Sequence, residues 1–303
     1  MVVIAPEFDV AAATIHAPAK LNLTLAIKGK RADGFHELHS LVVGVGVSDR
    51  LTGSTRRDGE IDLACSDARL CGPDNLALQA AQELKDLHPS APGMTLRLDK
   101  AIPVGGGLGG GSSDAAAALM LCNEVWSLGH TSAELAAIGA ELGSDVPLFF
   151  NLPAAVMSGR GERVSPVHFR WSGWALLVFV PEPVSTPEAY RAWSKQRCEN
   201  HDPSVVEAMV TARSADELMA AAFNDLEPAV LRIAPRVSDV FEKINHIGLG
   251  AFRISGAGST LFQLHDEEAA ARQAARAINE ANLGVSTTVV AAPTGTSAIR
   301  SEE

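Results

Sequence analysis

Apolar and polar residues alternate over much of the first 65 positions of the chain. Two extended segments each place four aliphatic residues on one face: Leu21, Leu23, Leu25 and Ile27 in the first, and Leu41, Val43, Val45 and Val47 in the second. A period of two residues is typical of β-strands with one buried face. The sequence therefore predicts two early strands, joined by the basic, turn-forming residues 28–34.

Helical spacing begins after residue 74. Asn75 is a candidate helix cap, because apolar residues recur behind it at helical spacing up to residue 87. Residues 94–99 alternate again and predict a half-buried strand. Two more helices should follow. One is buried and begins at Ser113, and the other covers residues 132–142 and ends at Gly143 in a left-handed C-cap.

The second half of the chain mixes both patterns. The expected elements are a strand over 174–180, helices over 203–225 and 229–245, a strand, glycine turn and strand over 252–264, a helix over 266–281 and a strand over 286–291. The pattern indicates an α+β protein. We expect a first domain over residues 1–160 and a second over 161–303, with residues 293–303 as a frayed, disordered tail.

Composition and charge narrow the class of protein. The chain has 303 residues, of which 47% are hydrophobic, so it can bury the interior of two ordinary domains. With 25 Lys and Arg against 36 Asp and Glu, its formal charge is −11. It lacks the basic excess that nucleic acid or an anionic membrane attracts. Any phosphate that the protein binds must therefore be bound locally.

The cysteines and the apolar runs indicate a cytoplasmic protein. Four cysteines, Cys65, Cys71, Cys122 and Cys198, form no Cys-x-x-Cys pair, so neither a disulfide framework nor a zinc site is expected. No apolar run reaches the roughly 20 residues of a membrane helix. Residues 1–13 contain acidic but no basic residues, unlike a signal peptide.

The strongest chemical signal is the segment from Pro103 to Asp114, which lies between a predicted strand and a predicted helix. It has six glycines in seven positions. Such a loop exposes backbone N–H groups and leads them into a helix N-terminus with partial positive charge. The segment predicts an anion or phosphate site. The alternative is a flexible tight turn, which would carry a heavy entropic cost.

Two well-known phosphate loops fit this segment poorly. A Walker A loop needs a lysine directly after its last glycine, and here Ser112 follows Gly111. The dinucleotide fingerprint Gly-x-Gly-x-x-Gly is matched, but any glycine-rich run contains it. It also requires an early parallel βαβ unit, whereas this loop follows hairpin-like strands. A dehydrogenase thus stays a distant alternative.

Three stretches together resemble the GHMP kinases, the family of galactokinase, homoserine kinase and mevalonate kinase. The glycine-rich loop with its Ser-Ser-Asp ending resembles the phosphate loop of the family, and residues 254–262 are similar to its C-terminal glycine motif. Residues 18–38 resemble the N-terminal signature of the branch that acts on a cytidine-diphosphate-linked methylerythritol. The three motifs occur in the family order and span most of the chain.

This resemblance implies both a fold and a reaction. The fold is the two-domain GHMP kinase fold, with a ribosomal-protein-S5-like N-terminal domain, a ferredoxin-like C-terminal domain and the active site in the cleft between them. The reaction is ATP- and Mg²⁺-dependent phosphorylation of the 2-hydroxyl of 4-diphosphocytidyl-2-C-methyl-D-erythritol, a step of the non-mevalonate isoprenoid pathway. Metal ligands and oligomeric state are not implied.

The resemblance also assigns catalytic roles. Asp145 matches the family's catalytic aspartate and would accept the hydroxyl proton. Lys20 matches the catalytic lysine, which would orient the hydroxyl and favour ionised Asp145. Taken without the resemblance, Asp145 is typical of a turn and Lys20 of a solvated strand end.

Binding residues follow from the same motifs. The ATP and phosphate site would contain Pro103, Gly105, Gly106, Gly107, Leu108, Gly109, Gly110, Gly111, Ser112 and Ser113, with Asn75 and Lys100 on the adenine side. The substrate site would contain Asn22, Phe35, His36, Tyr190, Gly256 and Gly258. In it the Phe35 ring stacks on cytosine, His36 bonds the base edge and Tyr190 covers the opposite face. Ser112, Ser113 and Asn75 are equally good helix caps.

Mild departures and two further alternatives remain. Phe35 replaces the commoner tyrosine of the family, and Asp114 stands where asparagine also occurs. Another GHMP kinase, such as a homoserine or mevalonate kinase, would share the glycine loops but not residues 28–38. A non-catalytic sensor on the same fold would be expected to lose the acid–base residue, yet Lys20 and Asp145 are both present.

Overall fold

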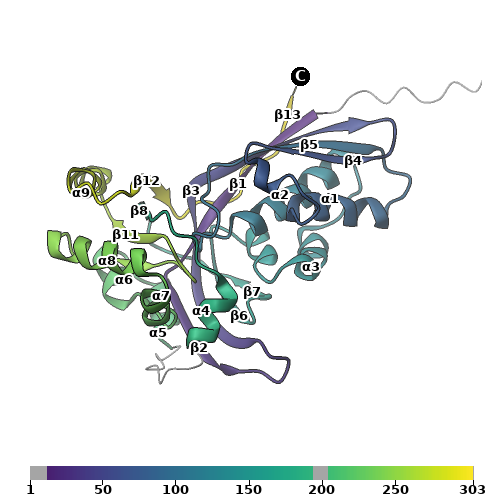
Figure 1. Ribbon diagram of the computed structural model, residues 1–303. Coiled ribbons are helices and arrows are strands. Elements are labelled where there is room, and N and C mark those ends of the chain that lie inside the picture. Colours follow the sequence, from purple (N-terminus) through teal and green to yellow (C-terminus); the bar gives the residue numbers. More distant parts are fainter. Residues whose placement is uncertain (1–11, 194–203, 303) are drawn as a thin grey trace, which may run out of the picture.

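The computed structural model describes residues 12–193 and 204–302. Two sheets organise the chain, and the long strands β1 and β3 run through the middle of the molecule (Figure 1). The first sheet contains β1 (Ala12–Asn22), β2 (Thr24–Lys30), β3 (His36–Arg56), β4 (Ile61–Cys65), β5 (Gly93–Asp99), β6 (Ala154–Gly159), β7 (Arg163–Pro166), β9 (Phe223–Asn224) and β13 (Arg300–Glu302). The second contains β8 (Gly173–Phe179), β10 (Arg253–Ile254), β11 (Leu261–His265) and β12 (Ser286–Ala292).

Helices cover both sheets. The helical elements beside the first sheet are η1 (Ala68–Leu70), α1 (Leu76–Leu87), α2 (Gly110–Val125), α3 (Ser132–Leu142) and η2 (Val146–Phe150). Those that follow β8 are α4 (Thr186–Trp193), α5 (Ser204–Val210), α6 (Ala215–Ala221), α7 (Glu227–Ile233), α8 (Pro235–Ile247) and α9 (Glu268–Glu280). Helix α2 packs on β1 and β3, and α9 packs on β8, β11 and β12. No helix in the described ranges is long and apolar enough to cross a membrane.

Strand β3 connects most of the first sheet. It pairs with β1, β2, β5 and β6, all antiparallel. Among the described residues, parallel pairing occurs between β4 and β5 and between β2 and β9. The β4–α1–β5 crossover is a parallel βαβ unit, but the glycine-rich loop follows its second strand, whereas the dinucleotide loop follows the first. The predicted α+β class is confirmed.

Several predicted elements form where local sequence signals are clear. Helix α1 begins after Asn75, whose side chain accepts a hydrogen bond from the Ala77 N–H, as expected of a cap. Helix α3 has the predicted bounds, because Thr131 and Glu134 form a reciprocal capping box. The predicted strands over 94–99, 174–180 and 286–291 correspond to β5, β8 and β12.

Other predicted elements were wrong in extent. The expected helix over 229–245 is divided at Pro235, which lacks an N–H and starts α8. The expected helix over 203–225 is divided at Ser214, which caps α6, and it ends in strand β9. Helix α2 begins at Gly110, inside the glycine run, rather than at Ser113.

Two local predictions failed for geometric reasons. The single strand predicted through Leu21 to Ile27 is broken at Leu23, so Leu21 and Leu25 pack into different apolar clusters. Gly143 ends α3 in an extended conformation, with φ −175°, not in the left-handed C-cap. The chain leaves α3 directly into the turn that carries Asp145.

The C-terminal segment is ordered over most of its length, so the prediction of a frayed tail was wrong. Strand β13 pairs antiparallel with β1, and the Thr294 N–H donates to the Gly44 carbonyl at 2.8 Å. A Cβ at position 44 would lie 1.9 Å from the Thr294 carbonyl oxygen, so only glycine permits this approach. The change from first to second sheet occurs between Pro166 and Gly173, which places residue 160 inside the β6–β7 hairpin.

Candidate functional site

The glycine-rich loop connects β5 to α2 and packs against the turn between β10 and β11. Gly105, Gly107 and Gly109 have φ near +70°, a region that favours glycine. A Cβ on Gly107 would lie 2.0 Å from the Ser255 carbonyl oxygen, so this contact also requires glycine. The first and last predicted glycine motifs therefore form one continuous surface.

Carbonyl groups of the loop are occupied by other parts of the chain. Leu108 O accepts from the Lys20 N–H at 3.0 Å, and Gly107 O accepts from the Ser255 hydroxyl at 3.0 Å. Gly106 O accepts from the Thr260 N–H at 3.2 Å. The polar groups left for an anion are the amides of the loop and the N-terminus of α2.

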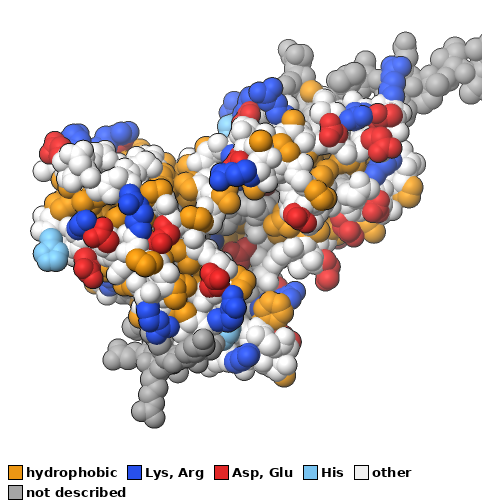
Figure 2. Space-filling view, viewed as in Figure 1, with side chains coloured by type: hydrophobic (Ala, Val, Ile, Leu, Met, Phe, Trp, Pro, Cys, Tyr) orange, Lys and Arg blue, Asp and Glu red, His pale blue; other side chains and the backbone are white. Residues whose placement is uncertain are grey.

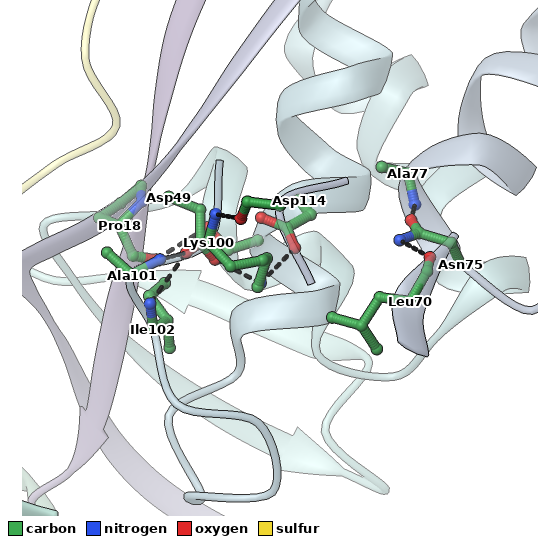
Figure 3. A network of polar contacts seen from close by, with 11 residues as sticks. Pro18, Asp49, Leu70, Asn75, Ala77, Lys100, Ala101, Ile102 and Asp114 are labelled. Carbon is green, nitrogen blue, oxygen red and sulfur yellow. Dashed lines mark hydrogen bonds and ion pairs between the residues drawn. The ribbon is translucent and has the colours of Figure 1, made fainter. Parts of the chain in front are cut away.

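A buried ion cluster lies behind the loop (Figure 3). Lys100 Nζ lies 2.5 Å from Asp49 Oδ2 and 2.6 Å from Asp114 Oδ2, and all three side chains are almost fully buried. Asp49 Oδ1 also accepts from the Ala101 and Ile102 N–H groups. The cluster thus ties β3, the segment after β5 and the first turns of α2 together.

The charges of this cluster shift the pKa values of Lys100 and Asp114. Burial opposes the charge of Lys100, but Asp114 and Asp49 leave its pKa raised. Burial raises the pKa of Asp114 to about 7, against the attraction of Lys100 and with the repulsion of Asp49. Asp114 Oδ1 has no hydrogen-bond partner among the described residues.

Lys20 lies on β1 at the opposite side of the loop. Its Nζ donates to Asn22 Oδ1 at 2.5 Å and lies 4.0 Å from Asp145 Oδ2. The Lys20 side chain is 6% exposed and that of Asp145 is 38% exposed. Burial lowers the pKa of Lys20, although Asp145 opposes this shift. Asn22 is held in turn by its Nδ2, which donates to the Ser40 hydroxyl at 2.8 Å.

Aromatic residues gather where β3 begins and α4 passes. The His36 ring stacks on Tyr190, with ring centroids 5.0 Å apart and an interplanar angle of 22°. The Trp193 ring meets His36 edge-on at 5.3 Å. Phe35 is half exposed, and the guanidinium of Arg160 lies 5.1 Å above its ring. Burial, with the charge of Lys30, lowers the pKa of His36, and burial with the charge of Asp145 raises that of Tyr190.

One cavity of about 980 Å³ unites these groups, and the face shown in Figure 2 is hollowed near its middle. Its lining includes most of the residues that the sequence predicted, namely Lys20, Asn22, Phe35, His36, Asn75, Lys100, Pro103, Gly105, Gly106, Gly107, Leu108, Gly109, Gly110, Gly111, Ser112, Asp145, Tyr190 and Gly256. The structure thus brings together side chains more than 160 positions apart in the sequence.

Two predicted residues do not line this cavity. Ser113 is buried and its hydroxyl donates to the Pro18 carbonyl at 2.7 Å, so it fixes α2 to β1. A Cβ on Gly258 would meet Val230 and Ile254, in the interior of the second half. Asn75 lines the cavity, yet both ends of its amide are occupied, by the Ala77 N–H and the Leu70 carbonyl.

Sequence reasoning missed several charged groups of the site. Asp49 is fully buried in β3, but in the sequence it is one polar residue in a strand, and only the strand register brings it to Lys100. Lys30, Arg160 and Arg191 also line the cavity. The glycines of the pattern Gly-Arg-Gly-Glu at 159–162 indicate a turn around Arg160, a local signal that could have drawn attention to it.

No group of three or more His, Cys, Asp or Glu residues within 12–193 and 204–302 is placed to hold a metal ion. Mg²⁺ in phosphoryl-transfer sites is usually held by substrate phosphates with one or two protein oxygens. Ser112 and Asp145 both line the cavity beside the loop, and their side-chain oxygens are of the kind that fits that requirement.

Comparisons with known proteins give consistent results. The family model for the GHMP kinases N terminal domain matches residues 75–159, and that for the GHMP kinases C terminal matches residues 205–283. A 4-diphosphocytidyl-2-C-methyl-D-erythritol kinase from Brevibacillus brevis is 38% identical over 260 residues, covering 84% of this chain and 88% of the relative. One from Parvibaculum lavamentivorans is 39% identical over 279 residues, covering 88% and 94%.

Solved structures agree with the sequence relatives. A crystal structure of 4-(cytidine 5'-diphospho)-2C-methyl-D-erythritol kinase superposes with a TM-score of 0.78 at 30% identity, covering 93% of this chain and all of that one. Homoserine kinase from Cytophaga hutchinsonii has a TM-score of 0.72 at 16% identity, which shows a shared fold. The predicted GHMP kinase fold is therefore confirmed.

Proposed function

Because the chain belongs to the GHMP kinases, and among them to the 4-diphosphocytidyl-2-C-methyl-D-erythritol kinases, we propose that it phosphorylates the 2-hydroxyl of that substrate with ATP. This is a step of the non-mevalonate route to isoprenoid precursors. One observation carries the proposal: a single cavity places Lys20 and Asp145 between the glycine-rich loop and the aromatic pocket. A phosphoryl donor on the loop and an acceptor whose cytosine occupies the aromatic pocket can meet there.

Asp145 is the proposed proton acceptor. Its carboxylate is partly exposed, makes no capping hydrogen bond and lies 4.0 Å from Lys20 Nζ. As the hydroxyl oxygen forms its bond to the γ-phosphorus, its proton passes to Asp145 and the bond to the β-phosphate oxygen breaks. The ADP leaves with the electron pair of that bond.

Lys20 is the proposed positioning cation. Its ammonium is held by Asn22 and sits on the same backbone segment that donates to Leu108 of the loop. Burial deprives this ammonium of its hydration. A negatively charged phosphate that binds beside it supplies a favourable electrostatic interaction in place of the lost hydration. Lys20 therefore orients the acceptor hydroxyl and stabilises negative charge that develops on the transferred group.

The glycine-rich loop is the proposed triphosphate site. Its amides and the N-terminus of α2 supply donors, since its carbonyls are bonded elsewhere. The Ser112 hydroxyl faces the cavity and is assigned to a phosphate oxygen. Mg²⁺ would arrive on ATP and neutralise charge on the β- and γ-phosphates. Asn75 is assigned to the adenine side, while Lys100 supports the loop through Asp49 and Asp114.

The aromatic pocket is the proposed cytidine site. Burial and the charge of Lys30 lower the pKa of His36, which favours the neutral ring, and a neutral imidazole can hydrogen-bond to a base edge. Tyr190 already stacks on His36, and half-exposed Phe35 presents an apolar ring to the cavity. Cytosine then stacks on Phe35 and hydrogen-bonds to His36.

The location proposed for the enzyme is the cytoplasm. Cys65, Cys71 and Cys122 are free thiols in the described part of the chain, which suits a reducing compartment. Cys198 lies outside the described residues. The acceptor is a small molecule, and no nucleic-acid or membrane partner is proposed.

An acceptor comparison tests the proposal. The protein with Mg²⁺ and ATP is offered 4-diphosphocytidyl-2-C-methyl-D-erythritol, homoserine and mevalonate in parallel, and each product is weighed by mass spectrometry. We expect one added phosphoryl group on the cytidyl substrate alone. Phosphorylation of only another alcohol would retain the fold and the loop but overturn the cytidine pocket. No reaction with any of the three would favour a sensor.

A further inference from the structure

The β6–β7 turn presents one arginine to the cavity from a tightly built support. Arg160 lies between Gly159, at φ +71°, and Gly161, at φ +115°. The Glu162 carboxylate accepts from the Arg160 N–H at 2.7 Å, and a Cβ on Gly159 would lie 2.5 Å from that carboxylate. The turn therefore depends on its glycines, and Glu162 fixes the backbone of Arg160 while its side chain stays free to enter the cavity.

Arg160 stands between the two ends of the proposed substrate. Its guanidinium lies 5.1 Å above the ring of Phe35, where the base is assigned. The next residue, Gly161, lies beside Asp145, the proposed proton acceptor, since a Cβ on Gly161 would be 3.4 Å from Asp145 Oδ1. A diphosphate that links a base on Phe35 to a hydroxyl at Asp145 must pass close to Arg160.

Charge around the cavity sets Arg160 and Lys30 apart from the other cations of the lining, and the charge of Lys30 acts on His36. Lys100 is neutralised by two aspartates, and Lys20 faces Asp145. Arg191 lies 3.8 Å from Glu188. The guanidinium of Arg160, in contrast, forms no ion pair with any described residue: it lies over the Phe35 ring, and the exposed carboxylate of Asp33 interacts with it only at longer range. A cation–π contact at a half-exposed ring is weak, so an anion can take the guanidinium from it.

We propose that Arg160 binds the diphosphate of the cytidine-linked acceptor, an inference that rests on the proposed function. The planar guanidinium presents paired N–H donors that match two phosphate oxygens, which lysine cannot do. Without substrate, Phe35 holds the side chain at the edge of the pocket. When the diphosphate binds, the guanidinium moves onto it and exposes the ring face for the base.

Comparing two ligands isolates this contact. Binding of CDP and of cytidine is measured by calorimetry, with a non-hydrolysable ATP analogue at saturation to occupy the nucleotide site. We expect wild type to bind CDP more tightly than cytidine, and Arg160→Gln to reduce CDP affinity roughly ten- to a hundredfold while cytidine affinity stays unchanged. The KM for the cytidyl substrate should rise by a similar factor, with the KM for ATP unaltered.

Two further variants control for folding and chemistry. Arg160→Lys keeps the charge but loses the paired donors, and should restore only part of the CDP affinity. Arg163→Gln, in an exposed position on the same hairpin, should leave both affinities at the wild-type level. A purely structural role for Arg160 would weaken CDP and cytidine equally.

Two results would overturn the assignment of Arg160. One is an unchanged CDP affinity in Arg160→Gln, and the other is an equal loss for cytidine and CDP. A different result speaks against the proposed function itself: wild-type protein that binds neither CDP nor cytidine, and phosphorylates no cytidyl substrate, has no cytidine site for Arg160 to serve. The two failures are therefore distinguishable.

Discussion

Two of the lysines that line the cavity, Lys20 and Lys100, are almost fully buried. The Lys100 ammonium is enclosed by Asp49 and Asp114, and its pKa is raised. The Lys20 ammonium has an amide oxygen at 2.5 Å and its nearest carboxylate only at 4.0 Å, and its pKa is lowered. The protein compensates one of these charges internally and leaves the other largely uncompensated.

This difference indicates a supporting role for Lys100 and is consistent with the phosphate-orienting role proposed for Lys20. A cation that protein carboxylates already neutralise has little to gain from a phosphate, whereas an undercompensated one is stabilised by it. We therefore infer that the region around Lys100 holds the loop in shape and that the region around Lys20 is prepared for phosphoryl transfer. Each region can be disturbed separately.

Removing the proton acceptor near Lys20 should have the largest effect. Asp145→Asn keeps the size of the side chain but cannot accept the hydroxyl proton, so we expect turnover to fall about 10²- to 10⁴-fold. Binding of ATP, measured by calorimetry, should change little because the loop is untouched. Asp62→Asn, in an exposed strand position far from the site, serves as the matched control. Near-normal turnover in Asp145→Asn would remove it from the role of base.

The second largest effect should fall on stability, at Lys100. Lys100→Met leaves Asp49 and Asp114 buried without their cation, which costs about 3–5 kcal/mol of the free energy of unfolding. Urea denaturation near pH 8, where Asp114 is ionised in wild type, measures this loss. Exposed ion pairs contribute about 1 kcal/mol or less to stability. A decrease in the free energy of unfolding no larger than this would show that the cluster does not stabilise the fold.

The same substitution at Lys20 should act on chemistry instead. Lys20→Met removes a charge whose burial is poorly compensated, so we expect stability to stay within about 1 kcal/mol of wild type. Turnover should fall about 10²- to 10³-fold, because a cation aimed at the developing charge is lost. Steady-state kinetics and urea denaturation on one preparation separate the two effects. Equal destabilisation by both Met variants would erase the contrast between the lysines.

The lowered pKa of Lys20 should also affect how the stability of the wild-type protein depends on pH. The folded pKa of Lys20 lies below its unfolded value, so the unfolded chain binds this proton more tightly. The resulting cost to stability is present below the folded pKa and is relieved as pH rises through it. In Lys20→Met this gain in stability with rising pH should disappear.

Local signals explain how much of the fold could be read from the sequence. Asn75 and Thr131 cap α1 and α3 with their own side chains, so these helices were predictable within a few residues. Strand β13 was not, because residues 293–303 carry no periodic pattern and their position depends on the gap left by Gly44. Pro235 was visible, but its effect on a helix prediction was underestimated.

The site shows a similar division. The glycine motifs, Lys20 and Asp145 could be found because each matches a family motif along the chain. Asp49 and Arg160 could not, since their importance depends on the strand register that sets Asp49 against Lys100 and on the turn that aims Arg160 at Phe35. The Asp49–Lys100 pair spans 51 positions and the Arg160–Phe35 contact spans 125, so the sequence can indicate a turn around Arg160 but not the partner of either residue.

The change expected over any single pH unit is smallest for Asp114, and it sharpens the account of the Lys100 region. Its pKa is raised to about 7 because burial disfavours the carboxylate, with Lys100 opposing the shift and Asp49 adding to it. Between pH 4 and 7 the folded chain therefore holds a proton that the unfolded chain has released. Stability must fall as pH rises through this window, by at most about 1.4 kcal/mol per pH unit for one proton.

Asp114→Asn cannot ionise but still offers Lys100 an oxygen, so this part of the pH dependence should vanish. Urea denaturation at pH 5, 6, 7 and 8 compares the variant with wild type, with Asp62→Asn as the control. We expect the variant to gain stability over wild type as pH rises, because it leaves Lys100 paired with Asp49 alone and the cluster neutral. Parallel curves for the two proteins would mean that Asp114 is ionised throughout and that the cluster carries its net negative charge at every pH tested.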